Sequence, residues 1–234
     1  MNAGFDTPII IIARDRYECL VEQISWLENA GYGRIYIVDN NSTYDPLLDY
    51  YENTTHTVIR IDANLGCIAP WRVDLMSMLG IEGRYVVTDP DVVPDENCPA
   101  NAIEYFSDVL DTYPHLNKVG FGLRIDDIPS HFKHHEEVIN WESKFWQDEI
   151  EPGLFNADID TTFALYHRHS SNIQGPAIRT GSPYLARHLG WYVNSKNPAD
   201  DFIYYKDHLP KNEEGFSYSV WAQDELAPVY VVPE

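Results

Sequence analysis

The sequence predicts an α/β fold in which a mostly parallel sheet lies between helices. Four short apolar runs occur before residue 89, and segments with helical periodicity separate them. Strands that alternate with helices are joined by right-handed crossovers, which makes the strands parallel. The four runs are residues 8–13, 35–38, 58–61 and 85–88.

Helical spacing of apolar residues identifies the segments between these runs. In the first segment this spacing covers residues 17–27, with Asp15 as the expected N-cap and Gly31 as the stop. Residues 45–51 and 70–79 give two further helices, and the second opens with a proline that suits the first helical turn. A strand and a helix therefore alternate along this part of the chain.

The pattern continues beyond the fourth run. Residues 102–113 have helical spacing, and residues 119–123 form a further strand that ends in the charged sequence Arg-Ile-Asp-Asp. Residues 132–147 are rich in aromatic residues and form a helix or a loop, while residues 158–166 join an acidic turn to a strand-like run. We therefore expect the sheet to continue past the fourth strand.

Two aspartates follow the fourth run directly, in the sequence Asp89-Pro90-Asp91. Residues i and i+2 of an extended strand point the same way, so both carboxylates can face one divalent cation, which prefers oxygen ligands. An Asp-x-Asp sequence also arises by chance in a chain with 37 acidic residues among 234. The position at a strand end is what favours a cation site, and such a cation could carry a diphosphate.

Polar residues also follow the other three runs. Arg14 follows the first, residues 39–42 follow the second and residues 64–66 follow the third. Ligands of parallel sheets bind beyond the carboxyl ends of the strands, so these residues indicate one binding edge. Neither a glycine-rich dinucleotide turn nor a P-loop is present, so a diphosphate would need a metal and arginines, of which Arg14 and Arg72 are the candidates.

Together these motifs resemble the GT-A glycosyltransferases, and in particular the family 2-like enzymes that transfer sugar from a nucleotide diphosphate. The resemblance implies a single GT-A domain over residues 1–234, with a Rossmann-like sheet. Residues 1–95 would be the nucleotide-sugar-binding half and residues 96–234 the acceptor-side half. The resemblance rests on Pro8-Ile9-Ile10-Ile11-Ile12, Ile37-Val38-Asp39-Asn40-Asn41-Ser42, Asn64-Leu65-Gly66 with Arg72 downstream, and Thr88-Asp89-Pro90-Asp91.

The resemblance also implies roles for single residues. Asp39 would bind uracil or a similar base, and Asn64 and Gly66 would lie beside the nucleoside. Asp89 would approach the ribose and the metal, while Asp91 would bind the metal directly. Asp39 and Asn64 also suit turns, because both residue types bond their own backbone, so on spacing alone a turn role fits them equally well.

A histidine late in the chain often completes the metal site of GT-A enzymes. We expect His188 in this role, in preference to His167, His169 and His208. A histidine beside tyrosine and tryptophan, as His188 is, also serves as a hydrogen-bonded structural residue. Both readings of His188 therefore stay open.

The resemblance implies a general base if the enzyme inverts the sugar. In inverting GT-A enzymes a carboxylate downstream of the metal pair deprotonates the acceptor hydroxyl. Asp160 is the first candidate and Asp127 is its competitor. A retaining enzyme would need neither, and the sequence does not decide the stereochemistry.

The predicted function is a metal-dependent, hexosyltransferase-like glycosyltransferase of glycan or polysaccharide synthesis. It would use Mn²⁺ or Mg²⁺ and move sugar from a UDP-sugar to a hydroxyl of a glycan, a lipid-linked saccharide or a glycoprotein. One alternative is a sugar-nucleotide nucleotidyltransferase, although the glycine-rich basic loop expected after the first strand is missing. The other is a non-catalytic module that binds nucleotide sugars or glycans.

The composition favours one domain and limits the partners. With 44% hydrophobic residues the chain can bury one substantial core. A net charge of -21 argues against nonspecific binding to nucleic acids or anionic membranes. No apolar run approaches the roughly 20 residues that span a bilayer, and no signal-peptide pattern is present, so we expect a soluble, cytoplasmic protein. Cys19, Cys67 and Cys98 are dispersed, as expected in a reducing compartment.

Overall fold

Four parallel strands form the first part of the sheet. The structure is a computed structural model that describes residues 5–170, 174–210 and 219–226. β1 pairs with β2 on one side and with β4 on the other, and β2 pairs with β3, all in parallel. The bounds are β1 (Ile9–Ala13), β2 (Ile35–Asp39), β3 (Thr57–Arg60) and β4 (Tyr85–Thr88).

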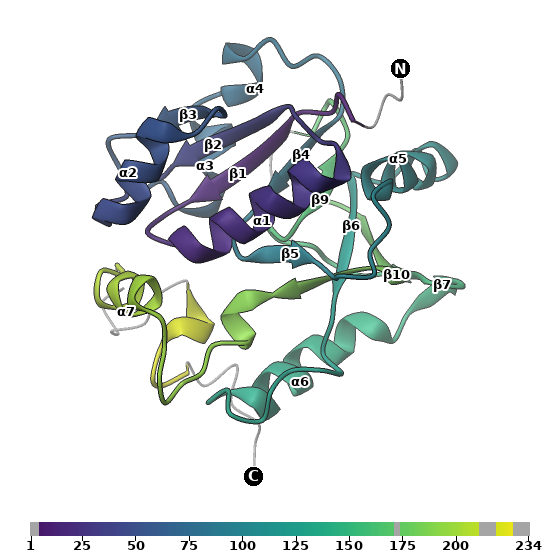
Figure 1. Ribbon diagram of the computed structural model, residues 1–234. Helices are drawn as coiled ribbons and strands as arrows, with labels where there is room; N and C mark the ends of the chain where they lie inside the picture. The colour runs from purple at the N-terminus through teal and green to yellow at the C-terminus, as the bar shows by residue number, and fades with distance from the viewer. Residues whose placement is uncertain (1–4, 171–173, 211–218, 227–234) are drawn as a thin grey trace.

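The sheet continues with a reversed strand, β9, which lies antiparallel between β4 and β6. β10 then pairs in parallel with β6, and the full order is β3-β2-β1-β4-β9-β6-β10-β8-β7, with β5 paired to β10. The predicted parallel sheet flanked by helices is confirmed (Figure 1). These bounds are β5 (Val92–Pro94), β6 (Lys118–Leu123), β7 (Glu149–Glu151), β8 (Leu154–Asn156), β9 (Ala164–Tyr166) and β10 (Ala177–His188).

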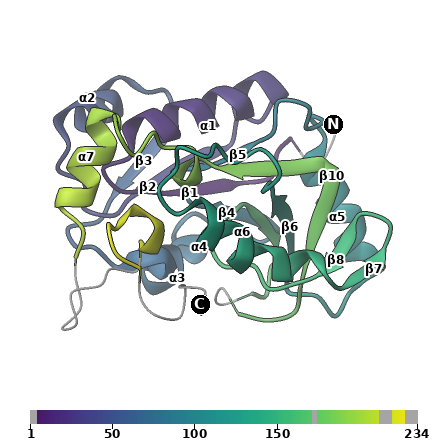
Figure 2. The ribbon, with the colours of Figure 1, turned by 90° about the horizontal axis from the view of Figure 1, so that it is seen from below.

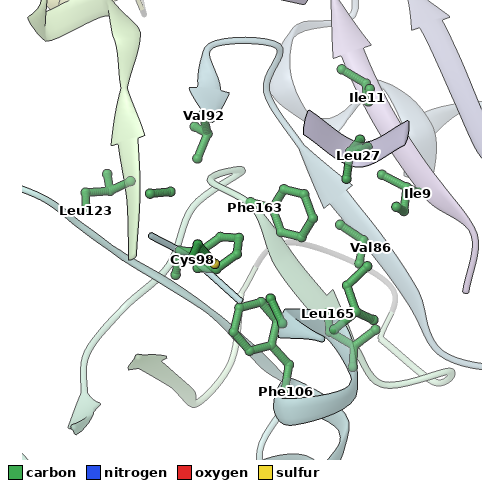
Figure 3. Close-up of a cluster of buried hydrophobic side chains, with 14 of the residues drawn as sticks. Ile9, Ile11, Leu27, Val86, Val92, Cys98, Phe106, Leu123, Phe163 and Leu165 are labelled. Carbon is green, nitrogen blue, oxygen red and sulfur yellow. The ribbon is translucent and has the colours of Figure 1, made fainter. Parts of the chain in front are cut away.

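The alternation of side chains along β1 explains how helices cover both faces of the sheet. Ile9 and Ile11 point into one core together with Leu27 of α1 (Tyr17–Ala30), and Figure 3 shows this cluster. Ile10 points to the opposite face and packs in a second core. Because successive residues of a strand face opposite sides, a strand that is apolar at every position must be buried on both faces.

The remaining helices follow the predicted order. Two of them, α2 and α5, match the predicted segments to within two residues, and the aromatic segment forms α6. The bounds are α2 (Asp45–Asn53), α3 (Ala69–Arg72), α4 (Leu75–Met78), α5 (Ala102–Thr112), α6 (His135–Ser143) and α7 (Asp200–Asp207), with 3₁₀ turns η1 (Gly66–Ile68), η2 (Lys144–Trp146), η3 (Leu189–Trp191) and η4 (Val220–Ala222).

Two local predictions were wrong. Asp15 is not the N-cap of α1, because its φ of 52° bends the chain away and its carboxylate accepts the backbone N–H groups of Thr43 and Tyr44 instead. The helix predicted over residues 70–79 is split, because Asp74 takes a φ of 50°, which ends α3 before α4 begins.

Among the described residues, no helix combines the length and the apolar character that crossing a bilayer requires.

The close approach of β9 to β6 depends on a residue without a side chain. A Cβ on Gly120 would lie 2.4 Å from the Phe163 carbonyl oxygen and 2.8 Å from Ala164 Cβ. We expect Gly120→Ala to lower the free energy of unfolding by about 1–3 kcal/mol, the usual cost of overpacking. Chemical denaturation measures it. Gly33→Ala is the matched control, because no atom lies within 4 Å of its added Cβ; equal effects of the two variants would contradict the prediction.

Candidate active site at the carboxyl edge of the parallel strands

Asp89 forms two hydrogen bonds with the loop that leads into β9. Its backbone N–H donates to the Thr161 carbonyl at 2.9 Å, and its Oδ2 accepts a hydrogen bond from Thr161 Oγ1 at 2.6 Å. Burial, and then the charge of neighbouring Asp91, raise the pKa of Asp89 well above its usual value, even though the Thr161 bond acts in the opposite direction. Asp89 therefore holds a proton more tightly than an aspartate in water does.

Asp160 lies in the same loop, and the reversal of β9 brings it to Asp89. β9 begins beside the end of β4 because the two strands run antiparallel. Asp160 is exposed, and its Oδ1 accepts the Thr162 N–H at 3.0 Å. Its charge adds to the raised pKa of Asp89, and the bonds between Thr161 and Asp89 hold this loop at the end of β4.

Asp91 faces an arginine and a histidine side chain. Its Oδ2 lies 3.2 Å from Arg16 Nη1, and its Oδ1 lies 3.8 Å from His188 Nε2. Burial acts to raise the pKa of Asp91, but the charges of His188 and Arg16 outweigh it and hold the pKa below its usual value. Asp91 is thus ionised and paired within the protein.

The side chains predicted to bind a metal, Asp89, Asp91 and His188, have protein partners in this structure, and metal binding by them stays a prediction. Among the described residues no group of three or more His, Cys, Asp or Glu side chains could hold an ion. Asp91 and His188 do meet, but Asp89 Oδ2 is bonded to Thr161 and Asp91 Oδ2 to Arg16. A divalent cation such as Mn²⁺ or Mg²⁺ needs several free oxygen ligands, and this arrangement does not fit one.

Sequence reasoning missed three residues that build this edge. Thr161 bonds to Asp89 and Arg16 bonds to Asp91. Gln23 of α1 fixes the turn that contains both aspartates. The Gln23 amide donates to the carbonyls of Asp89 at 2.9 Å and Val92 at 2.6 Å. The turn after β1 contains Arg16 and no glycine, which could have drawn attention to Arg16 in the sequence. The Thr161 contact could not be predicted, because it depends on the pairing of β4 with β9.

Asp39 is enclosed by the turn that follows β2. Its side chain is fully buried and accepts the Ser42 N–H at 3.1 Å, the Tyr51 hydroxyl at 3.2 Å and Arg60 Nε at 3.1 Å. These bonds give the Asp39 carboxylate a structural role at the end of β2 that does not require a ligand. The geometry favours the turn role, and base recognition by Asp39 stays a prediction.

The loop after β3 contains the other predicted nucleoside residues. Asn64 Oδ1 accepts the Gly66 N–H at 2.9 Å, and Arg72 Nη1 donates to the Leu65 carbonyl at 3.2 Å. Asp89, Asp160 and Arg72 all act electrostatically on the Cys67 thiol, whose pKa burial raises. Arg72 thus anchors the loop that follows β3, one of the parallel strands of the sheet.

Arg14 joins the ends of β1 and β2. Its Nη1 donates to the carbonyls of Asn40 at 2.9 Å and Asn41 at 3.0 Å, and its Nη2 reaches the His208 carbonyl at 3.4 Å. The side chain is 20% exposed. Arg14 can therefore contact a ligand only at the rim formed by these loops.

Asp127 belongs to a separate ion-pair network. Its Oδ2 lies 2.7 Å from Arg187 Nη2 and 3.3 Å from Arg124 Nε, and the Tyr192 hydroxyl donates to Oδ1. Burial acts to raise the pKa of Asp127, but the Tyr192 bond and the Arg187 pair together lower it. A carboxylate stabilised in this way is a poor proton acceptor, so the geometry favours Asp160 over Asp127 as a base.

The comparisons with known proteins concern the fold. No protein-family model and no curated protein matches the sequence. A mannosyltransferase from Pyrobaculum calidifontis, solved with GDP-Man and Mn²⁺, is similar with a TM-score of 0.50 and 15% identity over 86% of this chain. This chain spans 61% of the length of that mannosyltransferase.

Two further structures are more distant. HddC from Yersinia pseudotuberculosis has a TM-score of 0.38 and 12% identity, over 83% of this chain and 81% of its own. A putative glucose-1-phosphate thymidylyltransferase from Bacillus anthracis has a TM-score of 0.37 and 12% identity, over 89% of this chain and 78% of its own. The mannosyltransferase likeness confirms the predicted fold, a GT-A-like α/β architecture.

A buried ion pair lies behind Asp160 and joins α6 to β10. Glu142 accepts a hydrogen bond from Arg179 Nη1, and Arg179 Nε donates to the Asp158 carbonyl at 2.8 Å. Burial raises the pKa of Glu142 to about 7, against the lowering effect of Arg179 and with a further raising effect from Asp160. The folded state therefore binds a proton on Glu142 more tightly than the unfolded chain does.

This shift predicts a pH dependence of stability. Between pH 4.5, the usual pKa, and about 7, the folded state keeps the Glu142 proton that the unfolded chain releases. The stabilisation from the Glu142 proton is complete below pH 4.5. Within the window the free energy of unfolding falls with rising pH, by about 1.4 kcal/mol per pH unit. Denaturation at several pH values should show a smaller fall for Glu142→Gln. Glu136→Gln, exposed on α6, is the control and should keep the parental slope; an unchanged slope in Glu142→Gln would exclude the assignment.

Proposed function

We propose that this protein is a glycosyltransferase that moves sugar from a nucleotide diphosphate donor to a hydroxyl acceptor. The observation that carries the proposal is the pair of hydrogen bonds between Asp89 and Thr161, which holds the loop of Asp160 at the carboxyl edge of the parallel strands. Ligands of such sheets bind at that edge. A buried acid with a raised pKa beside a loop that carries an exposed carboxylate is a common arrangement for acid and base work.

The proposed chemistry is a single displacement at the anomeric carbon. The acceptor oxygen attacks that carbon, the bond from carbon to the β-phosphate oxygen breaks, and the nucleoside diphosphate leaves with the electron pair. Asp160 takes the proton of the attacking hydroxyl as general base. A single displacement of this kind inverts the anomeric carbon, whereas a retaining reaction would not need Asp160.

The donor residues follow from the loops at the same edge. Asn64 and Gly66 would border the nucleoside, and the exposed guanidinium of Arg72 would meet the diphosphate, with Arg14 at the rim. The donor we propose is a UDP-sugar, and the GDP-Man bound by the mannosyltransferase makes GDP-sugars the first comparison. Glycans, lipid-linked saccharides and glycoproteins are the acceptor classes to test.

A donor panel tests this function. The protein is incubated with UDP-sugars and GDP-sugars, and free UDP or GDP is measured, because a transferase slowly passes its sugar to water when no acceptor is present. Release of the nucleoside diphosphate supports the proposal. Conversion of a sugar nucleotide with pyrophosphate into a nucleoside triphosphate would identify a nucleotidyltransferase, and binding without turnover would identify a binding module.

The role of Asp160 is tested by a conservative substitution. Asp160→Asn should keep donor affinity but lower transfer by about 100- to 10,000-fold, the usual loss when positioned proton transfer is removed. Asp158→Asn in the same loop is the matched control, since Asp158 is also exposed and its carbonyl rather than its carboxylate holds Arg179. Kinetics with calorimetric donor binding measure both. Parental turnover in Asp160→Asn would reject the base and favour a retaining reaction.

A further inference from the structure

A buried arginine holds the second aspartate of the acidic pair. Arg16 is only 5% exposed, although it lies in the first turn after β1. Its Nη1 donates to Asp91 Oδ2 at 3.2 Å, and its Nη2 donates to Cys19 Sγ at 2.9 Å. A charge removed from water needs a partner of opposite sign, and Asp91 is that partner.

The other sides of Asp91 are filled by the protein itself. His188 Nε2 lies 3.8 Å from Oδ1, and the Leu189 N–H donates to the Asp91 carbonyl at 2.7 Å. A Cβ on Gly190 would lie 3.5 Å from Asp91 Oδ2 and 2.8 Å from the His188 ring. The backbone of η3 therefore packs directly against the carboxylate.

Helix α7 fixes Arg16 in this position. The guanidinium carbon lies 5.3 Å from the ring centre of Phe202 and 5.2 Å from that of Tyr205, distances at which a cation is attracted to an aromatic face. Asp201 Oδ2 accepts the Glu18 N–H at 3.0 Å, which anchors α7 to the start of α1. Figure 2 shows α7 beyond the end of β1. Arg16 is thus held between Asp91 and the two aromatic rings of α7.

We propose that Arg16 is the resident cation at Asp91, the second aspartate of the acidic pair, and takes the place of a divalent metal there. A metal ion bound by Asp89 Oδ2 and Asp91 Oδ2 would have to displace Thr161 and Arg16 from these two oxygens. The guanidinium already balances the charge of Asp91, and its rigid contacts hold the turn at the end of β4. Arg16 is thus a positioning residue. The catalytic meaning of this inference rests on the proposed function. The first test below measures only metal binding and does not depend on that function.

Titration with Mn²⁺ alone, followed by electron paramagnetic resonance, is the first test. We expect no Mn²⁺ binding by the parent protein that depends on Asp89. The substitution Asp89→Asn should therefore leave the titration unchanged. Arg16→Met should bind Mn²⁺ at least about tenfold more tightly than the parent, because Asp91 is then left without its guanidinium. Arg16→Lys, which keeps the charge, and Arg34→Met, at an exposed arginine, should behave like the parent. Parental Mn²⁺ binding that depends on Asp89, or no gain in a folded Arg16→Met variant, would overturn the proposal.

Nucleotide affinity of the parent protein is the second test, and it needs no variant that might lose its fold. UDP and GDP are titrated by calorimetry with EDTA and then with Mn²⁺. Equal affinity under both conditions is expected. A loss of about tenfold or more in EDTA would overturn the role of Arg16. If neither nucleotide binds under either condition, the proposed function fails, while the Mn²⁺ titration still decides what Arg16 does.

Discussion

The antiparallel pairing of β9 between β4 and β6 is the constraint on which the candidate site depends. It places the loop of Asp160 and Thr161 at the end of β4, beside Asp89. It requires a glycine at position 120, where β6 and β9 approach most closely. It also stacks Tyr166 on Tyr85, with ring centres 5.6 Å apart. A parallel strand in the same position would begin at the opposite edge of the sheet and leave Asp89 without these partners.

Two aspartates so close together at a buried edge create an electrostatic problem, because burial and mutual repulsion both oppose two negative charges. The structure meets it differently for each residue. Asp89 keeps a raised pKa, while Asp91 is ionised against Arg16 and His188. Removing one partner of such a buried pair leaves an uncompensated charge, which typically costs about 3–5 kcal/mol. The distribution of charge at this edge is therefore tied to the stability of the turn after β4.

Local patterns explain which parts of the fold could be predicted. β4 has the predicted bounds, because four apolar residues between polar ones are a local signal, and α1 and α5 follow from helical spacing. The break at Asp74 was missed because a positive φ in a non-glycine residue depends on surrounding contacts. The partners of Arg16 were missed for a related reason, since Phe202 and Tyr205 lie far along the chain and only the folded structure brings α7 to the first turn.

The partners of the arginines decide which of them can meet an anionic ligand in a chain with a net charge of -21. Arg16 and Arg60 each face a buried carboxylate. The carboxylates largely neutralise the charge of these arginines, so they attract a phosphate only weakly. Arg72 differs, since its guanidinium is exposed and donates to a backbone carbonyl. A carbonyl leaves the positive charge uncompensated, so Arg72 keeps the charge that a diphosphate would need at this edge.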